Sequence, residues 1–345
     1  MLRLPQFDVV APRTVAEAVA ALARPGARLV AGGTDLLPNL KHRLDSPPVL
    51  VSLRRVAGLD EVERVAGAAE AATATDDPEH LRIGAGVTLS ALSEHPLVRE
   101  HLPSLARAAG LVASPNIRNM ATIGGNVHLD TRCRYVNQSD FWRSAIGGCL
   151  KSEGDVCHVV PGGKNCVAAM SSDCVPVLIT LDAAAVLVGP DGTREVALAD
   201  YYGTDGVSHI AKRADELMTE LRVPLPRGPR RAGYAKWTVR HSIDFPLVSV
   251  ALRFDLDGPG PDAVIQTAKA CVGVLNARPR LVKRTESLTG KRLDDPAVTE
   301  TLCTLIAKQC KPLENVPYEA PYRHKMLPVY TRRAMQALLA EPTPG

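Results

Sequence analysis

Four unevenly spaced cysteines are the residues of this chain whose type most directly suggests chemistry. Cys133, Cys149, Cys157 and Cys166 are separated by 16, 8 and 9 residues, in a stretch rich in glycine, asparagine and serine. Four thiolates in an irregular loop can hold a zinc ion or a cubane iron–sulfur cluster. The spacing lacks the C-x-x-C pairs of common zinc modules and ferredoxins. It therefore leaves metal ligation and a set of buried structural thiols equally open.

The other four cysteines lie in apolar or regular segments, and we expect them to be thiols of the hydrophobic core. They are Cys174, Cys271, Cys303 and Cys310. Five of the eight cysteines fall between Cys133 and Cys174. In a reducing compartment, such clustering indicates metal or redox chemistry more often than disulfides.

Two loops with paired glycines could bind an anion. Gly32-Gly33 follows an expected strand, and Gly124-Gly125 lies between Thr122 and Asn126. The backbone N–H groups of such turns can hold a pyrophosphate, although each loop alone is equally an ordinary turn between two elements. Together they suit a long cofactor with two phosphates. Neither G-x-G-x-x-G nor a Walker A sequence occurs in the chain.

Two further side chains could complete such a site. Asp173 precedes an expected strand and could accept hydrogen bonds from sugar hydroxyls. Lys236 could stabilise an anionic reduced ring through its charge. Both also fit common surface patterns.

The hydrophobic pattern predicts an α+β protein in three parts around these loops. Residues 1–55 form one small α/β subdomain, residues 56–224 a second with an irregular insertion at 127–172, and residues 225–345 a C-terminal α+β domain. Strands are expected at 28–31, 49–53, 81–86, 185–188, 195–198, 232–239, 247–256 and 264–275, and directly after Asp173. Helices are expected after the capping box at 14–17 and at 102–111, 296–310 and 328–340.

Composition and charge exclude several classes of protein. The chain has 345 residues, 46% of them hydrophobic, which is typical of globular domains. Its 41 basic and 37 acidic residues give a net charge of +4, too small and too scattered for a nucleic-acid partner. No apolar run is long enough for a membrane span, and the first residues do not form a secretory signal. We therefore expect a cytoplasmic protein.

In their order, these segments resemble the FAD-binding subunits of molybdenum hydroxylases, the xanthine dehydrogenase family. The family's AGGTDL loop stands at 31–36, its G-A-x-V-T-L segment at 84–89, its IRN…ATIGGN loop at 117–126 and its S-D-x-x-P-x-L segment at 172–178. The resemblance implies a vanillyl-alcohol-oxidase (PCMH-type) fold, in which two α/β subdomains clamp FAD. It also implies a C-terminal domain like that of CO dehydrogenase flavoproteins, and no catalytic acid or base in this chain.

The resemblance also implies which residues contact FAD. They are Leu29, Val30, Ala31, Gly32, Gly33, Thr34, Asp35, Leu36, Thr122, Gly124, Asn126, Asp173, Met218 and Lys236.

One branch of the family, the beta subunits of 4-hydroxybenzoyl-CoA reductases, resembles this chain in the insertion and its cysteine spacing. That resemblance implies a [4Fe–4S] cluster on Cys133, Cys149, Cys157 and Cys166. Reduced ferredoxin would supply electrons that pass by way of this cluster and FAD to a small [2Fe–2S] subunit and a large molybdopterin subunit. The complex would be a dimer of heterotrimers that reductively dehydroxylates its substrate to benzoyl-CoA, a step of anaerobic aromatic degradation.

Two alternatives remain open from the sequence. One is the FAD subunit of an aerobic molybdenum hydroxylase that delivers electrons to NAD or a quinone. The other is a zinc-stabilised binding protein without redox chemistry.

Overall fold

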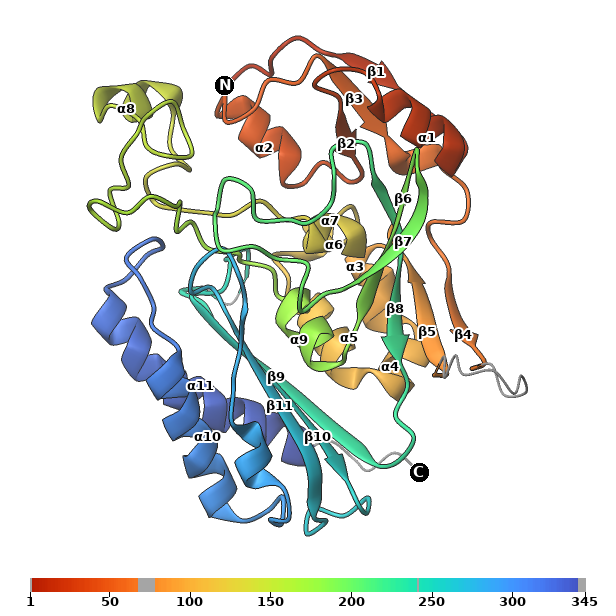
Figure 1. Cartoon of the computed structure of the whole chain (residues 1–345), viewed down its shortest axis with the longest axis vertical. Coiled ribbons are helices and arrows are strands. Elements are labelled where there is room, and N and C mark those ends of the chain that lie inside the picture. The colour runs from red at the N-terminus through yellow and green to blue at the C-terminus, as the bar shows by residue number, and fades with distance from the viewer. Residues whose placement is uncertain (1, 68–77, 241, 341–345) are drawn as a thin grey trace.

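The computed structural model describes residues 2–67, 78–240 and 242–340, which form three parts (Figure 1). The first part is a parallel sheet with the strand order β1-β3-β2. Its elements are β1 (Asp8–Val10), α1 (Val15–Leu22), β2 (Arg28–Val30), α2 (Leu36–Lys41), β3 (Val49–Ser52) and the 3-10 helix η1 (Leu53–Arg55). Helix α1 begins where the capping box predicts, because Thr14 Oγ1 accepts a hydrogen bond from the Glu17 N–H at 3.1 Å.

The second part contains an antiparallel sheet with the order β4-β5-β8-β6-β7. Its strands are β4 (Val62–Val65), β5 (His80–Gly84), β6 (Ala184–Gly189), β7 (Gly192–Ala197) and β8 (Leu217–Pro224). The strands expected at 185–188 and 195–198 are present as β6 and β7, which pair as an antiparallel hairpin. Its turn ends at Gly192, whose φ of 112° is accessible to glycine and strained for other residues.

Seven helices of the described chain belong to this second part. They are α3 (Leu89–Glu94), α4 (Pro96–His101), α5 (Pro103–Gly110), α6 (Pro115–Arg118), α7 (Ile123–Val127), α8 (Asp140–Ala145) and α9 (Cys174–Thr180). Helix α9 stands where a strand was expected, so that prediction was wrong. Every residue of α9 is buried, so its short apolar run lacks the periodicity that separates a helix from a strand.

The C-terminal part is an antiparallel sheet with two long helices on one face. It consists of β9 (Arg230–Trp237), β10 (Val248–Leu256), β11 (Ile265–Gly273), β12 (Arg280–Leu281), the 3-10 helix η2 (Thr285–Leu288), α10 (Pro296–Gln309) and α11 (Ala320–Ala340). Helix α11 begins at Ala320, eight residues before Pro328, whereas the sequence predicted that it begins at Pro328. The helix continues through this proline because Leu327, Tyr330 and Ala334 are packed in the core.

The C-terminal sheet is buried on both faces. Helices α10 and α11 cover one face, whereas α5 and α9 of the second part contact the other (Figure 1). Successive residues of a strand point to opposite faces, so Tyr234 joins the core of the second part and Ala235 joins the C-terminal core. The sheet thereby fixes the C-terminal part against helices α5 and α9 of the second part.

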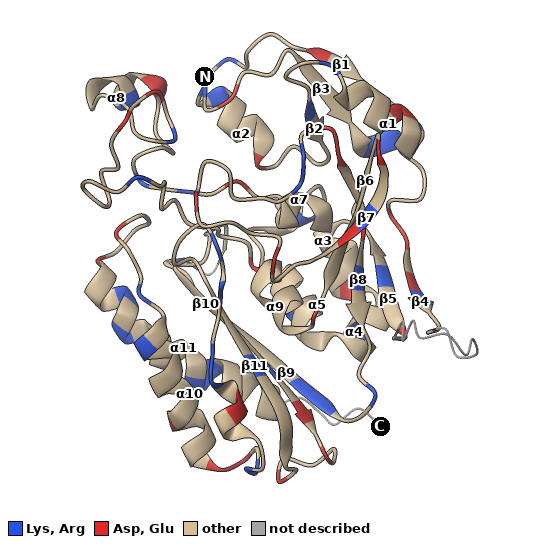
Figure 2. Ribbon diagram, viewed as in Figure 1, with Lys and Arg blue, Asp and Glu red and all other residues tan. Residues whose placement is uncertain are grey.

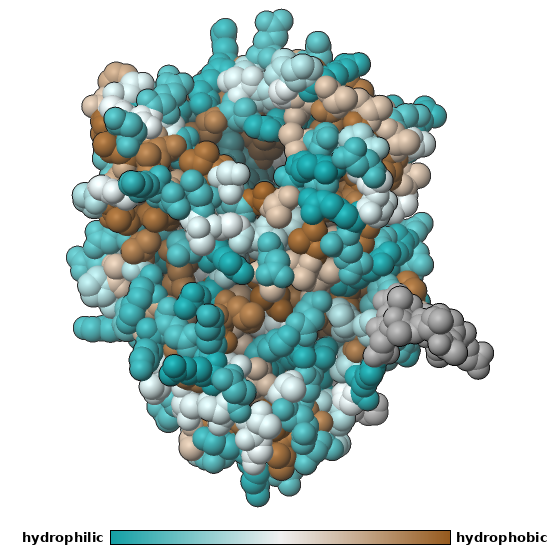
Figure 3. Space-filling view, in the orientation of Figure 1, coloured by the Kyte–Doolittle hydropathy of each residue, from teal (hydrophilic) through white to brown (hydrophobic). Residues whose placement is uncertain are grey.

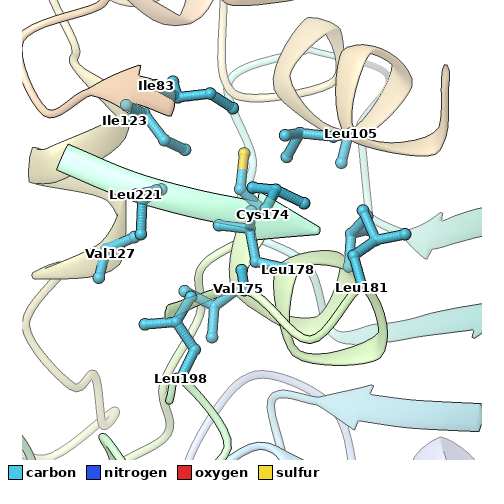
Figure 4. Close-up of a cluster of buried hydrophobic side chains, with 14 of the residues drawn as sticks. Ile83, Leu105, Ile123, Val127, Cys174, Val175, Leu178, Leu181, Leu198 and Leu221 are labelled. Atoms are coloured by element: carbon cyan, nitrogen blue, oxygen red, sulfur yellow. The ribbon is translucent and has the colours of Figure 1, made fainter. Parts of the chain in front are cut away.

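The four cysteines expected in the core are all buried. Figure 4 shows Cys174 surrounded by apolar side chains of the second part, and burial raises the pKa of its thiol well above the usual range. Figure 2 shows basic and acidic residues distributed over all three parts. Within the described ranges, the helices are too short or too polar to cross a membrane.

Candidate functional site

A cleft of about 710 Å³ is lined by loops from all three parts of the chain. Figure 3 shows the surface hollowed beside the N-terminal subdomain, with hydrophobic residues inside the hollow. Apolar residues such as Leu22, Leu53 and Leu217 line the cleft together with the two glycine loops. Such a mixture of apolar wall and polar backbone is typical of a cofactor site.

The first glycine loop follows β2 and lies against the second loop. A Cβ atom on Gly32 would lie 1.8 Å from the carbonyl oxygen of Met120, so only glycine permits this approach. Gly33 has a φ of +70°, which turns the chain into α2. The loop thereby presents backbone to the cleft with little side chain in the way.

The second glycine loop begins α7. Thr122 Oγ1 accepts a hydrogen bond from the Gly125 N–H at 3.0 Å, and the Gly124 N–H donates to the Ala85 carbonyl at 2.9 Å. Asn126 Oδ1 accepts a hydrogen bond from the Ser172 hydroxyl at 2.6 Å. The loop therefore fixes the position of the segment that carries Asp173.

Asp173 lines the cleft within a buried group of three polar side chains. Its carboxylate accepts hydrogen bonds from the Tyr234 hydroxyl at 2.7 Å and from Lys236 Nζ at 3.2 Å. Burial raises the pKa of Asp173, while the charge of Lys236 and the bond from Tyr234 oppose that rise. Lys236 also donates to the Leu111 carbonyl at 2.8 Å, so its charge is held beside Asp173.

The four clustered cysteines line one small cavity in the insertion. Cys149, Cys157 and Cys166 are buried, and Cys133 is partly exposed. Burial, aided by the three neighbouring thiols, raises the pKa of Cys133 to about 11. Backbone N–H groups point at two of the sulfurs, from Val160 to Cys157 at 3.4 Å and from Ala168 to Cys166 at 3.5 Å.

Asp35 connects the first glycine loop to the start of the insertion. Its carboxylate accepts a hydrogen bond from the Asp130 N–H at 3.1 Å and pairs with the Arg132 guanidinium. Burial raises the pKa of Asp35 against the opposing charge of Arg132. The cleft and the cysteine cavity are thus joined by residues adjacent to Cys133.

Comparison with known protein families shows to which family this chain belongs. Residues 5–226 match the family described as the FAD binding domain in molybdopterin dehydrogenase, and residues 234–338 match the CO dehydrogenase flavoprotein C-terminal domain. The chain is an FAD-binding subunit of the molybdenum hydroxylase family. The predicted α+β fold, an FAD-binding domain followed by a C-terminal domain of the CO dehydrogenase flavoprotein type, is thereby confirmed.

Individual relatives agree with this assignment. The FAD subunit is 37% identical to the aldehyde oxidoreductase FAD-binding subunit PaoB of Escherichia coli over 72% of this chain and 77% of that protein. It is 30% identical to the carbon monoxide dehydrogenase medium chain of Afipia carboxidovorans over 96% of both chains. A crystal structure of Cu,Mo-CO dehydrogenase superposes with a TM-score of 0.75 and 27% identity, covering 98% of this chain and 99% of that one.

The matched families are described by FAD and flavoprotein chemistry alone, so the [4Fe–4S] cluster stays a prediction. The predicted FAD contacts also stay predictions, although all except Lys236 line the cleft of the FAD subunit. Those on its wall are Leu29, Val30, Ala31, Gly32, Gly33, Thr34, Asp35, Leu36, Thr122, Gly124, Asn126, Asp173 and Met218. Lys236 approaches the cleft through Asp173.

Sequence reasoning missed several basic side chains of the FAD subunit's cleft, among them His128, Lys151 and Lys212. Burial lowers the pKa of His128 to about 4, so at neutral pH it donates from Nδ1 to the Gly124 carbonyl and accepts from the Tyr201 hydroxyl at Nε2. Burial also lowers the pKa of Lys212 to about 8. The only sequence signal for these residues is their position: His128 lies two residues after the G-G-N motif, and Lys151 lies two residues after Cys149.

Proposed function

We propose that this FAD subunit transfers electrons between two redox groups, FAD and a [4Fe–4S] cluster held by Cys133, Cys149, Cys157 and Cys166. The observation that carries the proposal is that these four cysteines, selected by spacing and resemblance, line one cavity. FAD supplies one- and two-electron chemistry and the cluster one-electron chemistry when bound. The residues of the chain bind and orient these groups.

The surroundings of the cysteines suit a cluster. The N–H groups of Val160 and Ala168 point at ligand sulfurs, and such bonds stabilise thiolates and tune cluster potentials. Over the described ranges, no three His, Cys, Asp or Glu side chains are arranged to hold a single metal ion. A cluster distributes its four thiolates over four iron atoms, so it does not need three ligands on one metal ion.

The proposal includes partners and a direction of electron flow. The chain would accept electrons from reduced ferredoxin and deliver them to a small [2Fe–2S] subunit and a large molybdopterin subunit. In this reading, the complex is a 4-hydroxybenzoyl-CoA reductase, and the support is the cysteine spacing.

A second candidate reaction has separate support. The relative with 37% identity is the FAD-binding subunit of an aldehyde oxidoreductase. In this reading, the complex oxidises an aldehyde, and the same chain passes electrons outward to an external acceptor.

Metal analysis of the purified complex tests the cluster. We expect about four iron atoms per chain at this site, and Cys149→Ser should remove them while FAD stays bound, because none of the four cysteines lines the FAD cleft. Cys303→Ala is the matched control, since Cys303 is buried in α10 away from the cavity. Zinc without iron, or full iron content in Cys149→Ser, would contradict the proposal.

Turnover by the same complex separates the two reactions. Formation of benzoyl-CoA from 4-hydroxybenzoyl-CoA with a low-potential donor supports the reductase. Reduction of an acceptor by an aromatic or aliphatic aldehyde, without benzoyl-CoA formation, supports the oxidoreductase.

A further inference from the structure

Lys151 occupies a position between the two proposed redox sites. Among the residues that the structure describes, it alone lines both the cysteine cavity and the FAD cleft. Its side chain is only 11% exposed, so water screens its charge weakly.

Hydrogen bonds hold the Lys151 ammonium in place. Nζ donates to Asp130 Oδ1 at 2.6 Å and to the Gly206 carbonyl at 2.8 Å, and it also contacts Thr131. The positive charge of Lys151 therefore has a fixed position in the wall between the two sites. The ammonium group of an unbonded lysine side chain would instead sample many positions in water.

Each partner of Lys151 leads to one of the two sites. The Gly206 N–H donates to the Cys166 carbonyl at 2.8 Å, and a Cβ on Gly206 would lie 2.9 Å from Cys166 Sγ. On the other side, the Asp130 N–H donates to Asp35 in the first glycine loop at 3.1 Å. The wall between the sites is thus a hydrogen-bonded layer around the largely buried ammonium group of Lys151.

We propose that Lys151 is a positioning residue whose fixed charge raises the reduction potential of the cluster and, more weakly, that of FAD. The proposal rests on the cluster of the proposed function. A reduced cluster carries one more negative charge than an oxidised one, so a nearby cation stabilises the reduced form. Asp130 offsets part of this charge, since its carboxylate is paired with the same ammonium.

Redox titration of the assembled complex measures this effect. We expect Lys151→Gln to lower the one-electron midpoint potential of the cluster by a shift equivalent to roughly tenfold in the equilibrium constant, about 59 mV. Lys151→Arg keeps the charge and should hold the potential near its original value. Lys164→Gln is the matched control, because Lys164 lies two residues before Cys166 but is exposed to water.

The opposite change provides an independent variant. Asp130→Asn leaves Lys151 without its counter-charge, so the midpoint potential of the cluster should rise. An unchanged potential in Lys151→Gln, or an equal fall in Lys164→Gln, overturns the proposal. If Lys151→Gln does not fold, Asp130→Asn tests the proposal in its place. A midpoint potential of the cluster that stays the same or falls in Asp130→Asn then overturns the proposal.

Iron content separates this inference from the proposed function. A complex that contains FAD and no iron contradicts the cluster itself. In that case the two-electron midpoint potential of the bound FAD is measured instead. If this potential does not fall in Lys151→Gln, the role proposed for Lys151 is overturned.

Discussion

Gly32 and Met120 approach more closely than any side chain at position 32 would allow. The contact joins the two glycine loops, which come from different subdomains and together line the cleft. A single methyl group at this position would have to push the loops apart, because the atom it meets is backbone and cannot rotate away.

Gly32→Ala should therefore weaken FAD binding. Forcing a methyl group into such a contact costs about 1–3 kcal/mol or more, which corresponds to roughly tenfold or greater loss of affinity. The ratio of flavin absorbance to protein after gel filtration measures the loss. Gly228→Ala is the control, since nothing lies within 4 Å of its added Cβ, and equal flavin retention in both variants would refute the steric argument.

Residue type and spacing predicted the cysteines of the cavity but could not predict the charges around them. Thiols are few in the chain, so their clustering is visible, and all four of the selected set line one cavity. Lysines are common, and Lys151 gains its position through partners such as Gly206, 55 residues away in the sequence. No local pattern encodes a contact of that separation.

At the scale of elements, Arg323 ties α11 to the rest of the C-terminal part. It is fully buried, and its guanidinium donates to the carbonyls of Leu247, Val274 and Leu313. Burial lowers the pKa of Arg323 to about 10, so the group stays charged at neutral pH. Its fork of N–H groups lets one side chain satisfy three segments.

Arg323→Lys should destabilise the protein by about 3 kcal/mol or more, because one ammonium cannot reach all three carbonyls and leaves buried acceptors unpaired. The free energy of unfolding in urea measures the loss. The control is Arg332→Lys, an exposed residue of α11 paired with Glu300, for which we expect a change below about 1 kcal/mol. Equal losses in the two variants would show that burial of Arg323 adds nothing.

Elements with clear local signals were predicted from the sequence, and elements fixed by tertiary packing were not. The hairpin of β6 and β7 follows from a Gly-Pro-Asp-Gly turn between alternating strands. Helix α9 consists of an apolar run that is compatible with a buried strand or a buried helix. Only its packing in the folded structure, where every residue is buried, shows that it is a helix. The early start of α11 likewise depends on packing that overrides the tendency of Pro328 to begin a helix.

At the scale of the whole molecule, Arg132 joins the three parts of the chain. It belongs to the insertion, pairs with Asp35 of the first subdomain, and stacks on Phe245 of the C-terminal part with its Cζ atom 3.9 Å from the ring centre. Asp35 and Phe245 both line the cleft. One side chain therefore holds two walls of the cleft in position.

Arg132→Gln should weaken FAD binding by roughly tenfold, since it removes a partly buried ion pair and a cation–π contact that together contribute on the order of 1–2 kcal/mol. Fluorescence titration of the deflavinated complex with FAD measures the change in Kd. The control is Arg240→Gln in the loop that carries Phe245, where an exposed arginine pairs with Asp244. A larger loss in the control would contradict the role assigned to Arg132.

The hydrogen bond between Ser172 and Asn126 has an evolutionary consequence. These residues bracket the cysteine-bearing segment, so that segment leaves and re-enters the fold at one point. The entropy of closing a loop grows slowly with its length, by about 0.6 kcal/mol for each doubling, so a long segment costs little more there than a short one. The segment between Asn126 and Ser172 can thus be gained or lost in evolution without a change in the positions of its two ends. Protein design could likewise transfer the segment to a flavoprotein that has the same hydrogen-bonded Asn and Ser pair.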